Sequence, residues 1–230
     1  ELAATYSNLG LLQTKANEID AAGTAFREAI RLYEERLREE SGDLTSRRKL
    51  GTAYNNLGAS LLDKDPARAA EYYLSAREQQ KLATESRPRD PRLQSELALT
   101  QNNLGSALAR VNKLAEAVAS YEQAIAIQSQ LVTLAPEQWS YRHGLAVSYN
   151  NLGLAQTRLK QLADAERSFG FALQAHRELV AQSPDNPELR SSTGGVYNNQ
   201  GIVLEEQNRL PEAAEAFRSA IEQQRIAQER

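Results

Sequence analysis

Paired asparagines are the residues of this 230-residue chain best placed to do chemistry. One pair, Asn150 and Asn151, lies within the motif Tyr-Asn-Asn-Leu-Gly that ends at Gly153. A carboxamide can donate and accept hydrogen bonds at once. A row of carboxamides along one surface could therefore hold an extended peptide by its backbone, with little selectivity for the peptide's side chains.

The motif occurs five times with small changes. Its glycine, the repeat glycine, occupies positions 10, 58, 105, 153 and 201, at spacings of 48, 47, 48 and 48. The asparagine two residues before it is present in every copy: Asn8, Asn56, Asn103, Asn151 and Asn199. The asparagine three residues before it is Asn55, Asn102, Asn150 and Asn198. A fixed period of this size indicates a stacked-repeat protein.

Charged residues recur on the same predicted helix face, five residues after the repeat glycine. They are Lys15, Asp63, Arg110, Arg158 and Glu206. Arg110 and Arg158 come from adjacent repeats, and with Asn103 and Asn151 they could grip a ligand carboxylate through charge-assisted hydrogen bonds. Two alternatives stay open. The charges could only complement the helix dipole, and the asparagines could bond neighbouring helices or water.

The elements that must position these side chains are predicted to be two helices per repeat. In the third repeat, Asp90 and Pro91 supply a cap and a first turn, and the helix is predicted to run to Arg110. Its apolar residues are spaced by four, seven and four positions, which places them on one face of the helix. Second helices are predicted over 18–40, 66–86, 113–134, 161–182 and 210–229.

No alternating strand pattern competes with these helices, so the predicted fold class is all-α. We expect one elongated domain over 1–230. Its repeats are predicted at about 1–42, 43–89, 90–136, 137–185 and 186–230. Gly194 and Gly195 weaken the first helix of the fifth repeat, by up to about 1 kcal/mol each relative to Ala, so fraying or bending is expected there.

The second helices carry recurring slots 12, 16 and 19 residues after the repeat glycine, filled in the fourth repeat by Ala165, Phe169 and Ala172. Together with Tyr149 and the Leu-Gly step at Gly153, this pattern resembles the tetratricopeptide repeat (TPR). The resemblance implies a right-handed α-solenoid whose first helices line a concave groove, and a peptide-binding role for the asparagines.

The repeats depart from that family in length. They have 47 or 48 residues, against about 34 in the usual unit. The surplus equals roughly four helical turns, so each helix is predicted to be about two turns longer than usual. Long-helix arrays of this kind are similar to those of bacterial regulatory kinases and kinesin light chains.

Composition argues against other functions. The net charge of −3 and the absence of a block of like charge disfavour nucleic-acid binding. No apolar run is long enough for a membrane span. With no cysteine and two histidines, no metal site or cofactor is predicted, and no arrangement of catalytic residues stands out. We therefore expect a protein that is not an enzyme, and we place it in the cytoplasm.

The function predicted from these features is a protein-interaction scaffold that binds an extended peptide or partner segment. One alternative is a regulatory or oligomerisation arm of a larger enzyme, such as a bacterial Ser/Thr protein kinase. Another is self-association through the solenoid ends without a peptide ligand. The chain contains no methionine and begins only nine residues before Gly10, so we expect it to be a piece of a longer protein.

Overall fold

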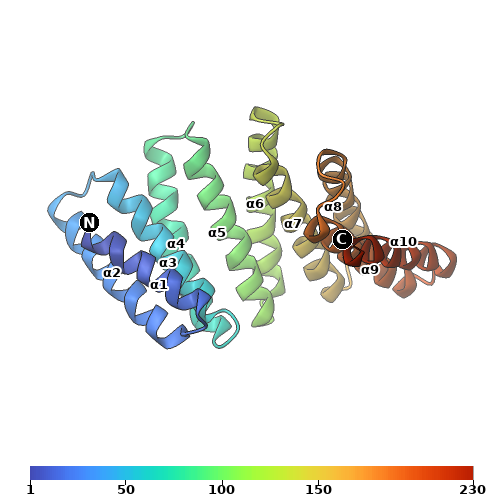
Figure 1. Cartoon of the computed structure of the whole chain (residues 1–230), viewed down its shortest axis with the longest axis horizontal. Helices are drawn as coiled ribbons and strands as arrows, with labels where there is room; N and C mark the ends of the chain where they lie inside the picture. The colour runs from blue at the N-terminus through green and yellow to red at the C-terminus, as the bar shows by residue number, and fades with distance from the viewer. Residues whose placement is uncertain (230) are drawn as a thin grey trace. The chain divides into compact units, whose positions relative to one another are not determined.

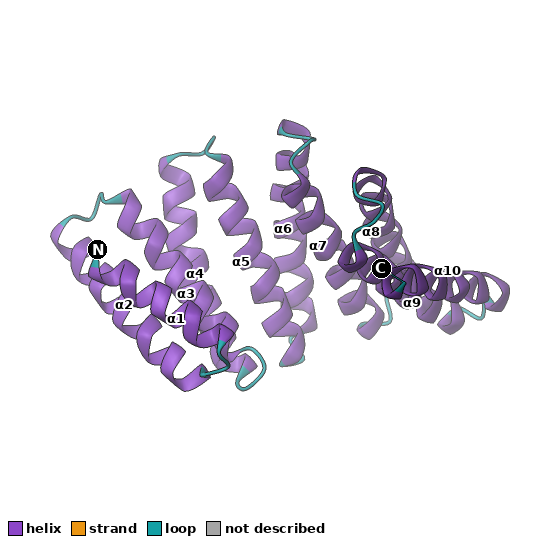
Figure 2. Ribbon diagram, viewed as in Figure 1, coloured by secondary structure: helices purple, strands orange, loops and turns teal. Residues whose placement is uncertain are grey.

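The computed structural model describes residues 1–229, which form ten α-helices and no strand (Figure 1, Figure 2). The first helices of the repeats are α1 (Leu2–Lys15), α3 (Leu44–Leu61), α5 (Pro91–Arg110), α7 (Trp139–Arg158) and α9 (Pro187–Glu206). The second helices are α2 (Ile19–Glu39), α4 (Pro66–Ser86), α6 (Leu114–Leu134), α8 (Leu162–Gln182) and α10 (Leu210–Gln228). The all-α repeat fold is confirmed, and each second helix agrees with its predicted range to within one residue at either end.

Backbone packing divides the chain into two compact units. Unit 1 runs from Glu1 to Glu116 and contains α1 to α5, while unit 2 begins at Ala117 and contains α7 to α10. The boundary falls in the first turn of α6. Within each unit, helices that follow one another in the chain pack side by side, as α3 does on α2 and α4. The prediction of one domain over 1–230 stays a prediction.

The helix starts follow from local capping chemistry. The Asp43 side chain accepts a hydrogen bond from the Ser46 backbone N–H (3.0 Å) at the start of α3, and Asp90 accepts one from Arg92 (2.9 Å) at the start of α5. Such caps satisfy backbone donors that the first helical turn leaves unpaired. Between the helices of four repeats, one residue takes a left-handed conformation. These residues are Asn17, Asn112, Lys160 and Asn208.

The core of unit 2 is built around Phe169, whose side chain is fully buried between α7, α8 and α9. A Cβ atom placed on Gly153 would lie 2.6 Å from Cε1 of the Phe169 ring. The repeat glycine is therefore required because only a residue without a side chain lets α7 lie directly against the aromatic ring. Gly10 meets Phe26 in the same way, with a corresponding distance of 2.7 Å.

Two glycine-to-alanine changes test this packing and are expected to have opposite signs. Gly153→Ala should lower the free energy of unfolding by about 1–2 kcal/mol, since overpacking outweighs the better helix propensity of Ala. Gly170→Ala, in α8, should raise it by about 0.5–1 kcal/mol, because a Cβ there meets no atom within 4 Å. Urea denaturation followed by circular dichroism measures both. Equal effects from the two changes would contradict the packing described.

The first helix of the fifth repeat is not frayed, contrary to expectation: α9 runs unbroken from Pro187 to Glu206. A Cβ on Gly194 would lie 3.0 Å from the Ala220 carbonyl oxygen and 2.9 Å from Cγ of Gln224. Gly194 thus allows α9 to approach α10 closely. Burial of its neighbours Thr193 and Val196 further holds the helix in place. Tertiary packing here outweighs the weak helix propensity of the two glycines.

Candidate functional site

The recurring asparagines all lie on first helices, but their exposure differs from repeat to repeat. Asn55 and Asn102 are buried, and Asn8 and Asn198 are exposed. The remaining five are half-buried: Asn56, Asn103, Asn150, Asn151 and Asn199. The same sequence position therefore differs in burial among the repeats: Asn55 is buried and Asn198 is exposed.

In unit 1 these amides join neighbouring first helices. The Oδ1 atom of Asn55, on α3, accepts hydrogen bonds from the Thr100 hydroxyl (3.0 Å) and from Nδ2 of Asn103 (3.1 Å), both on α5. The carboxamide oxygen of Asn55 thereby accepts from two donors of the following repeat. Because Asn55 and Thr100 are buried, loss of this bonding would leave polar atoms unpaired inside the protein.

Unit 2 contains an equivalent bond. Nδ2 of Asn199, on α9, donates to Oδ1 of Asn150, on α7, at 3.0 Å. In both units the second asparagine of one repeat donates to the first asparagine of the preceding repeat. The structure therefore contains the inter-helix bonding that the sequence left open as an alternative. By contrast, the side chains of Asn8, Asn56 and Asn198 make no hydrogen bond with any residue of the described range.

The inter-repeat bond uses only part of each carboxamide. A carboxamide has two N–H donors and an oxygen with two lone pairs. Asn103 and Asn199 each use one donor in the bond to the neighbouring repeat. Within residues 1–229, the oxygen and the second donor of each have no other partner, so they remain available to a ligand.

Apolar residues lie beside the asparagines on the first helices, at the position one residue after the repeat glycine. Leu11, Leu154 and Ile202 occupy it in three repeats, and all three are exposed. Because it lies three residues after the second asparagine, this position shares the asparagine's helix face. The sequence analysis did not single out these residues, although their helical spacing from the asparagines was the signal that could have found them.

Two of the charges five residues after the repeat glycine, Asp63 and Arg110, pair with each other, and a third, Glu206, pairs with a lysine seven residues after the preceding repeat glycine. In unit 1 the Arg110 guanidinium lies 2.8 Å from an oxygen of Asp63, in the preceding repeat. In unit 2, Nζ of Lys160 lies 2.9 Å from an oxygen of Glu206. These pairs are largely exposed and contribute little stability. They do mean that a ligand carboxylate would have to compete with Asp63 for Arg110.

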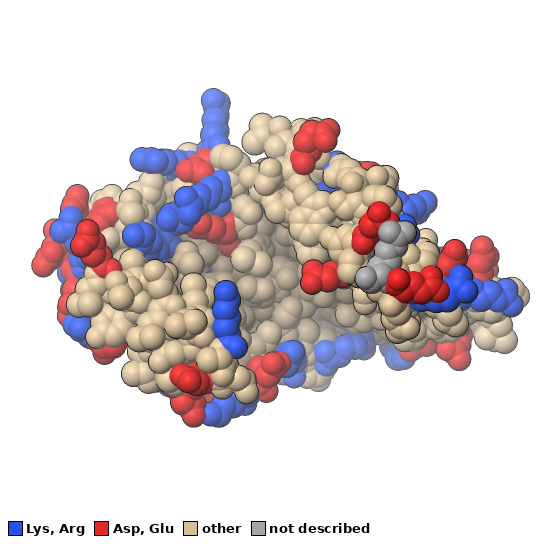
Figure 3. Space-filling model, viewed as in Figure 1, with Lys and Arg blue, Asp and Glu red and all other residues tan. Residues whose placement is uncertain are grey.

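Arg158, the other predicted contact for a carboxylate, is an exposed residue at the end of α7 in unit 2. Arg110 ends α5 in unit 1. Binding of a ligand carboxylate by these two arginines together stays a prediction. On the face drawn in Figure 3, Lys and Arg side chains are interspersed with Asp and Glu, without a continuous basic block.

The two histidines lie together in unit 2. The His143 ring stacks on the exposed ring of Trp139, with centroids 4.6 Å apart. His176, on α8, is 2% exposed, and burial, with a smaller contribution from His143, lowers its pKa to about 4. Burial also lowers the pKa of His143. Within residues 1–229, no three His, Asp or Glu side chains are arranged to hold a metal ion.

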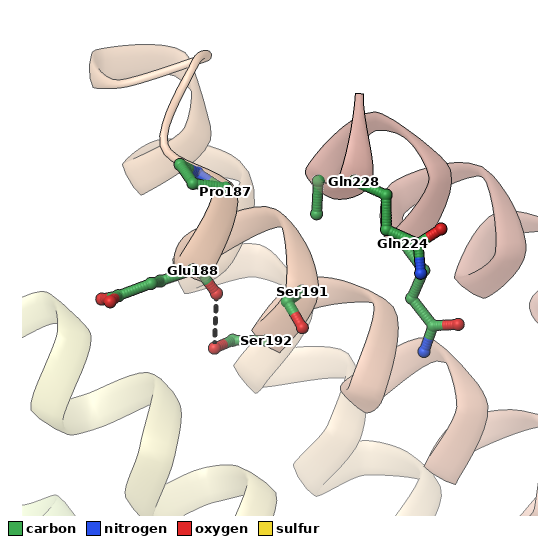
Figure 4. Close-up of a pocket in the computed structure, with 7 residues that line it drawn as sticks. Pro187, Glu188, Ser191, Ser192, Gln224 and Gln228 are labelled. Atoms are coloured by element: carbon green, nitrogen blue, oxygen red, sulfur yellow. Dashed lines mark hydrogen bonds between the residues drawn. The ribbon is translucent and has the colours of Figure 1, made fainter. Parts of the chain in front are cut away.

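A pocket of about 590 Å³ opens between the start of α9 and the end of α10 (Figure 4). It is lined by Glu188, Ser191, Ser192 and Gln224 among others, and Ser192 donates to the Glu188 carbonyl oxygen (2.8 Å) within the helix. A second pocket, of about 550 Å³, lies at the equivalent place in the second repeat. Because both pockets lie between the start of a first helix and the end of the second helix of the same repeat, they result from how the two helices of a repeat pack.

Two models of the tetratricopeptide repeat match the sequence, one over residues 97–132 and 145–188 and the other over 3–36. The chain is a tetratricopeptide-repeat protein. Solenoids of this family present extended surfaces that bind other proteins, and the chain is accordingly a protein-interaction scaffold. None of the helices within residues 1–229 combines the length and the apolar character needed to cross a membrane.

Solved structures share the fold of this TPR protein. BtubC (BKLC) from P. vanneervenii is 20% identical, with a TM-score of 0.70 over 95% of this chain and 78% of that one. The apo form of RapI is 16% identical, with a TM-score of 0.68 over 98% of this chain, which spans 53% of RapI. MamA is 19% identical, with a TM-score of 0.50 over 96% of this chain and 97% of MamA. No curated protein sequence matches this one.

Proposed function

We propose that this TPR protein is a non-catalytic scaffold that binds an extended peptide, or an extended segment of a partner protein, along the faces of its first helices. The carboxamides two residues before the repeat glycine would bond the ligand backbone. The exposed apolar residues one position after the glycine would contact ligand side chains. In unit 2, Leu154 and Ile202 favour a ligand with an apolar side chain beside its bonded backbone.

The observation that carries the proposal is the bonding between repeats. The bonds from Asn103 to Asn55 and from Asn199 to Asn150 hold the two donor carboxamides in one orientation before any ligand arrives. Groups that are already ordered lose less conformational freedom on binding, which favours affinity. A free oxygen and a free N–H on each amide match the alternating donors and acceptors of an extended backbone.

The proposal is tested by selecting ligands from a phage-displayed library of random peptides and measuring the affinity of the enriched peptides by calorimetry. Asn56→Ala and Asn199→Ala remove one carboxamide from each unit. We expect the double variant to bind the selected peptides about tenfold more weakly or worse, as the loss of one or two net hydrogen bonds predicts. Asn56→Ala alone should weaken binding without changing stability, since Asn56 bonds to no other described residue.

A matched control removes a carboxamide elsewhere. Gln174 is exposed on α8, a second helix, and Gln174→Ala should leave affinity unchanged. Two results would count against peptide binding through the asparagines. One is that no peptide is enriched over a bead control. The other is that enriched peptides bind the folded double variant as tightly as the original chain.

A further inference from the structure

The loop that joins the second repeat to the third differs in charge from the other loops between repeats. Four residues form each of these loops, which span 40–43, 87–90, 135–138 and 183–186. Only the loop 87–90 contains basic residues, Arg87 and Arg89, whereas the other three contain acidic residues and neither lysine nor arginine. Loops at equivalent places therefore present opposite charge.

The two arginines of this loop are not engaged by the rest of unit 1. Both are exposed, and neither guanidinium forms a hydrogen bond or an ion pair with any other residue between 1 and 229. Asp90, the acidic residue of the same loop, caps α5 by accepting hydrogen bonds from the backbone N–H groups of Arg92 (2.9 Å) and Leu93 (3.4 Å). The donors of Arg87 and Arg89 are therefore open to a ligand.

Other arginines near this loop already have partners. The Arg47 guanidinium, on α3, donates to the Ser41 carbonyl oxygen at 2.7 Å. The guanidinium groups of Arg48 and Arg92 lie 2.7 Å and 3.3 Å from the Glu96 carboxylate. Pairing within the chain thus occupies the neighbouring cations and leaves the two in the loop 87–90 unused.

The pocket of the second repeat lies beside these arginines. Its volume is about 550 Å³, and Arg87 lines it together with Leu44 and Leu82 among others. Leu82 is 39% exposed, so the pocket offers an apolar wall next to an unpaired cation. Glu85 also lines the pocket, and its carboxylate lies 3.9 Å from Nζ of Lys81, which offsets part of its charge.

We propose that this pocket and the loop 87–90, together named the basic pocket, bind an acidic segment of a partner protein. An apolar side chain of the segment would enter against Leu44 and Leu82, and the carboxylates beside it would pair with Arg87 and Arg89. Hydrogen bonds from Arg to a carboxylate are charge-assisted and directional, which suits this recognition. The pocket at the equivalent place in the fifth repeat is lined by Glu188 and by no basic residue, so it would reject the same ligand.

The basic pocket lies at the ends of α3 and α4 and does not include the asparagines of the first helices. Its ligand is therefore a second one, and neither proposal depends on the other.

The test measures binding of a fluorescein-labelled peptide, one leucine between two pairs of glutamates, to the full chain by fluorescence anisotropy at low salt. The variant that combines Arg87→Gln and Arg89→Gln loses two exposed charges and should bind the peptide at least about tenfold more weakly. A peptide with serine in place of leucine should bind the original chain roughly fivefold more weakly, because it leaves the apolar wall uncovered.

A charge-matched control combines Arg27→Gln and Arg68→Gln. Arg27 lies on α2, and Arg68 lies in the first turn of α4, at the opposite end of that helix from the basic pocket. Both are exposed, so the control loses the same charge as the test variant without altering the pocket. It should bind the leucine peptide as tightly as the original chain does.

Four results would overturn the proposal: the leucine peptide does not bind, a peptide with lysines in place of the glutamates binds as tightly, the serine peptide binds as tightly, or the control variant loses as much affinity as the test variant. Displacement of the peptide by an oligothymidylate of equal charge, as readily as by unlabelled peptide, would also overturn it. The site would then recognise negative charge alone.

Discussion

Phe169→Ala is expected to lower the free energy of unfolding by about 3–5 kcal/mol, the usual result of truncating a fully buried aromatic residue. The Phe169 ring packs among Ala165, Ala172, Leu173 and Val203, and Gly153 lies directly against it. Truncation removes ring contacts from three helices at once and leaves a cavity that their backbones cannot close. Urea denaturation followed by circular dichroism measures the change.

The control for this prediction lies two residues along the same helix. Phe171 is 51% exposed, and its ring packs on the Tyr149 ring, with centroids 5.1 Å apart. Phe171→Ala should lower the free energy of unfolding by about 1 kcal/mol, the value of one aromatic pair. If Phe171→Ala were as damaging as Phe169→Ala, the core of unit 2 would not lie where the structure places it.

Acid is expected to destabilise unit 2 through His176. Burial lowers the pKa of His176 from the ordinary value of 6.5 to about 4 in the folded protein. Well above pH 6.5 the histidine is neutral in both states and adds no pH dependence. As the pH falls from 6.5 towards 4, the unfolded chain takes up a proton that the folded protein does not, so the folded state loses about 3 kcal/mol in total.

The groups around His176 do not offset the cost of protonating its buried ring. His143, on α7, adds a like charge when it is protonated and further lowers the pKa of His176. The acidic Glu178 lies 2.8 Å from the Arg142 guanidinium and is engaged there. Glu188, on α9, acts on His143, where it opposes the effect of burial on the pKa. Nδ1 of His176 has no hydrogen-bond partner within the described residues.

His176→Gln isolates this effect. Glutamine fills the same slot as Gln80 and Gln128 in other repeats, where it is also buried, so the variant should fold. The free energies of unfolding of the variant and the original chain are compared by urea denaturation at pH 7 and pH 4.5. We expect the variant to lose about 2.5 kcal/mol less between these two values. An equal loss in both proteins would show that His176 carries no part of the acid sensitivity.

The amides that join repeats bear directly on the proposed binding surface. A substitution at Asn103 or Asn199 removes a bond between repeats together with a candidate ligand contact, so loss of binding alone would not identify the contact. Asn56 makes no such bond and separates the two roles. Measurements of stability and affinity on the same variants are therefore both needed.

The sequence by itself determined the repeat and its helices. The spacing of the repeat glycine, the Ala and aromatic slots and the Asp90–Pro91 cap predicted α5 from Pro91 to Arg110, as observed. These features are local: helix faces and caps depend on residues a few positions apart, so a single sequence displays them. The close fit of Gly153 on Phe169 also follows from slots that recur in every repeat, although only the structure shows the contact.

Only the tertiary structure decided which asparagines are buried, which bond to a neighbour and which remain open. Asn55 and Asn198 occupy the same position of the repeat. Asn55 is buried and accepts a hydrogen bond from Thr100 of α5, whereas Asn198 is exposed. Likewise, the sequence around Gly194 predicts a weakened helix, and only the structure shows that α10 packs against this glycine. The physical reason is that burial and hydrogen bonding depend on groups from other helices, many residues away, which a local pattern does not contain.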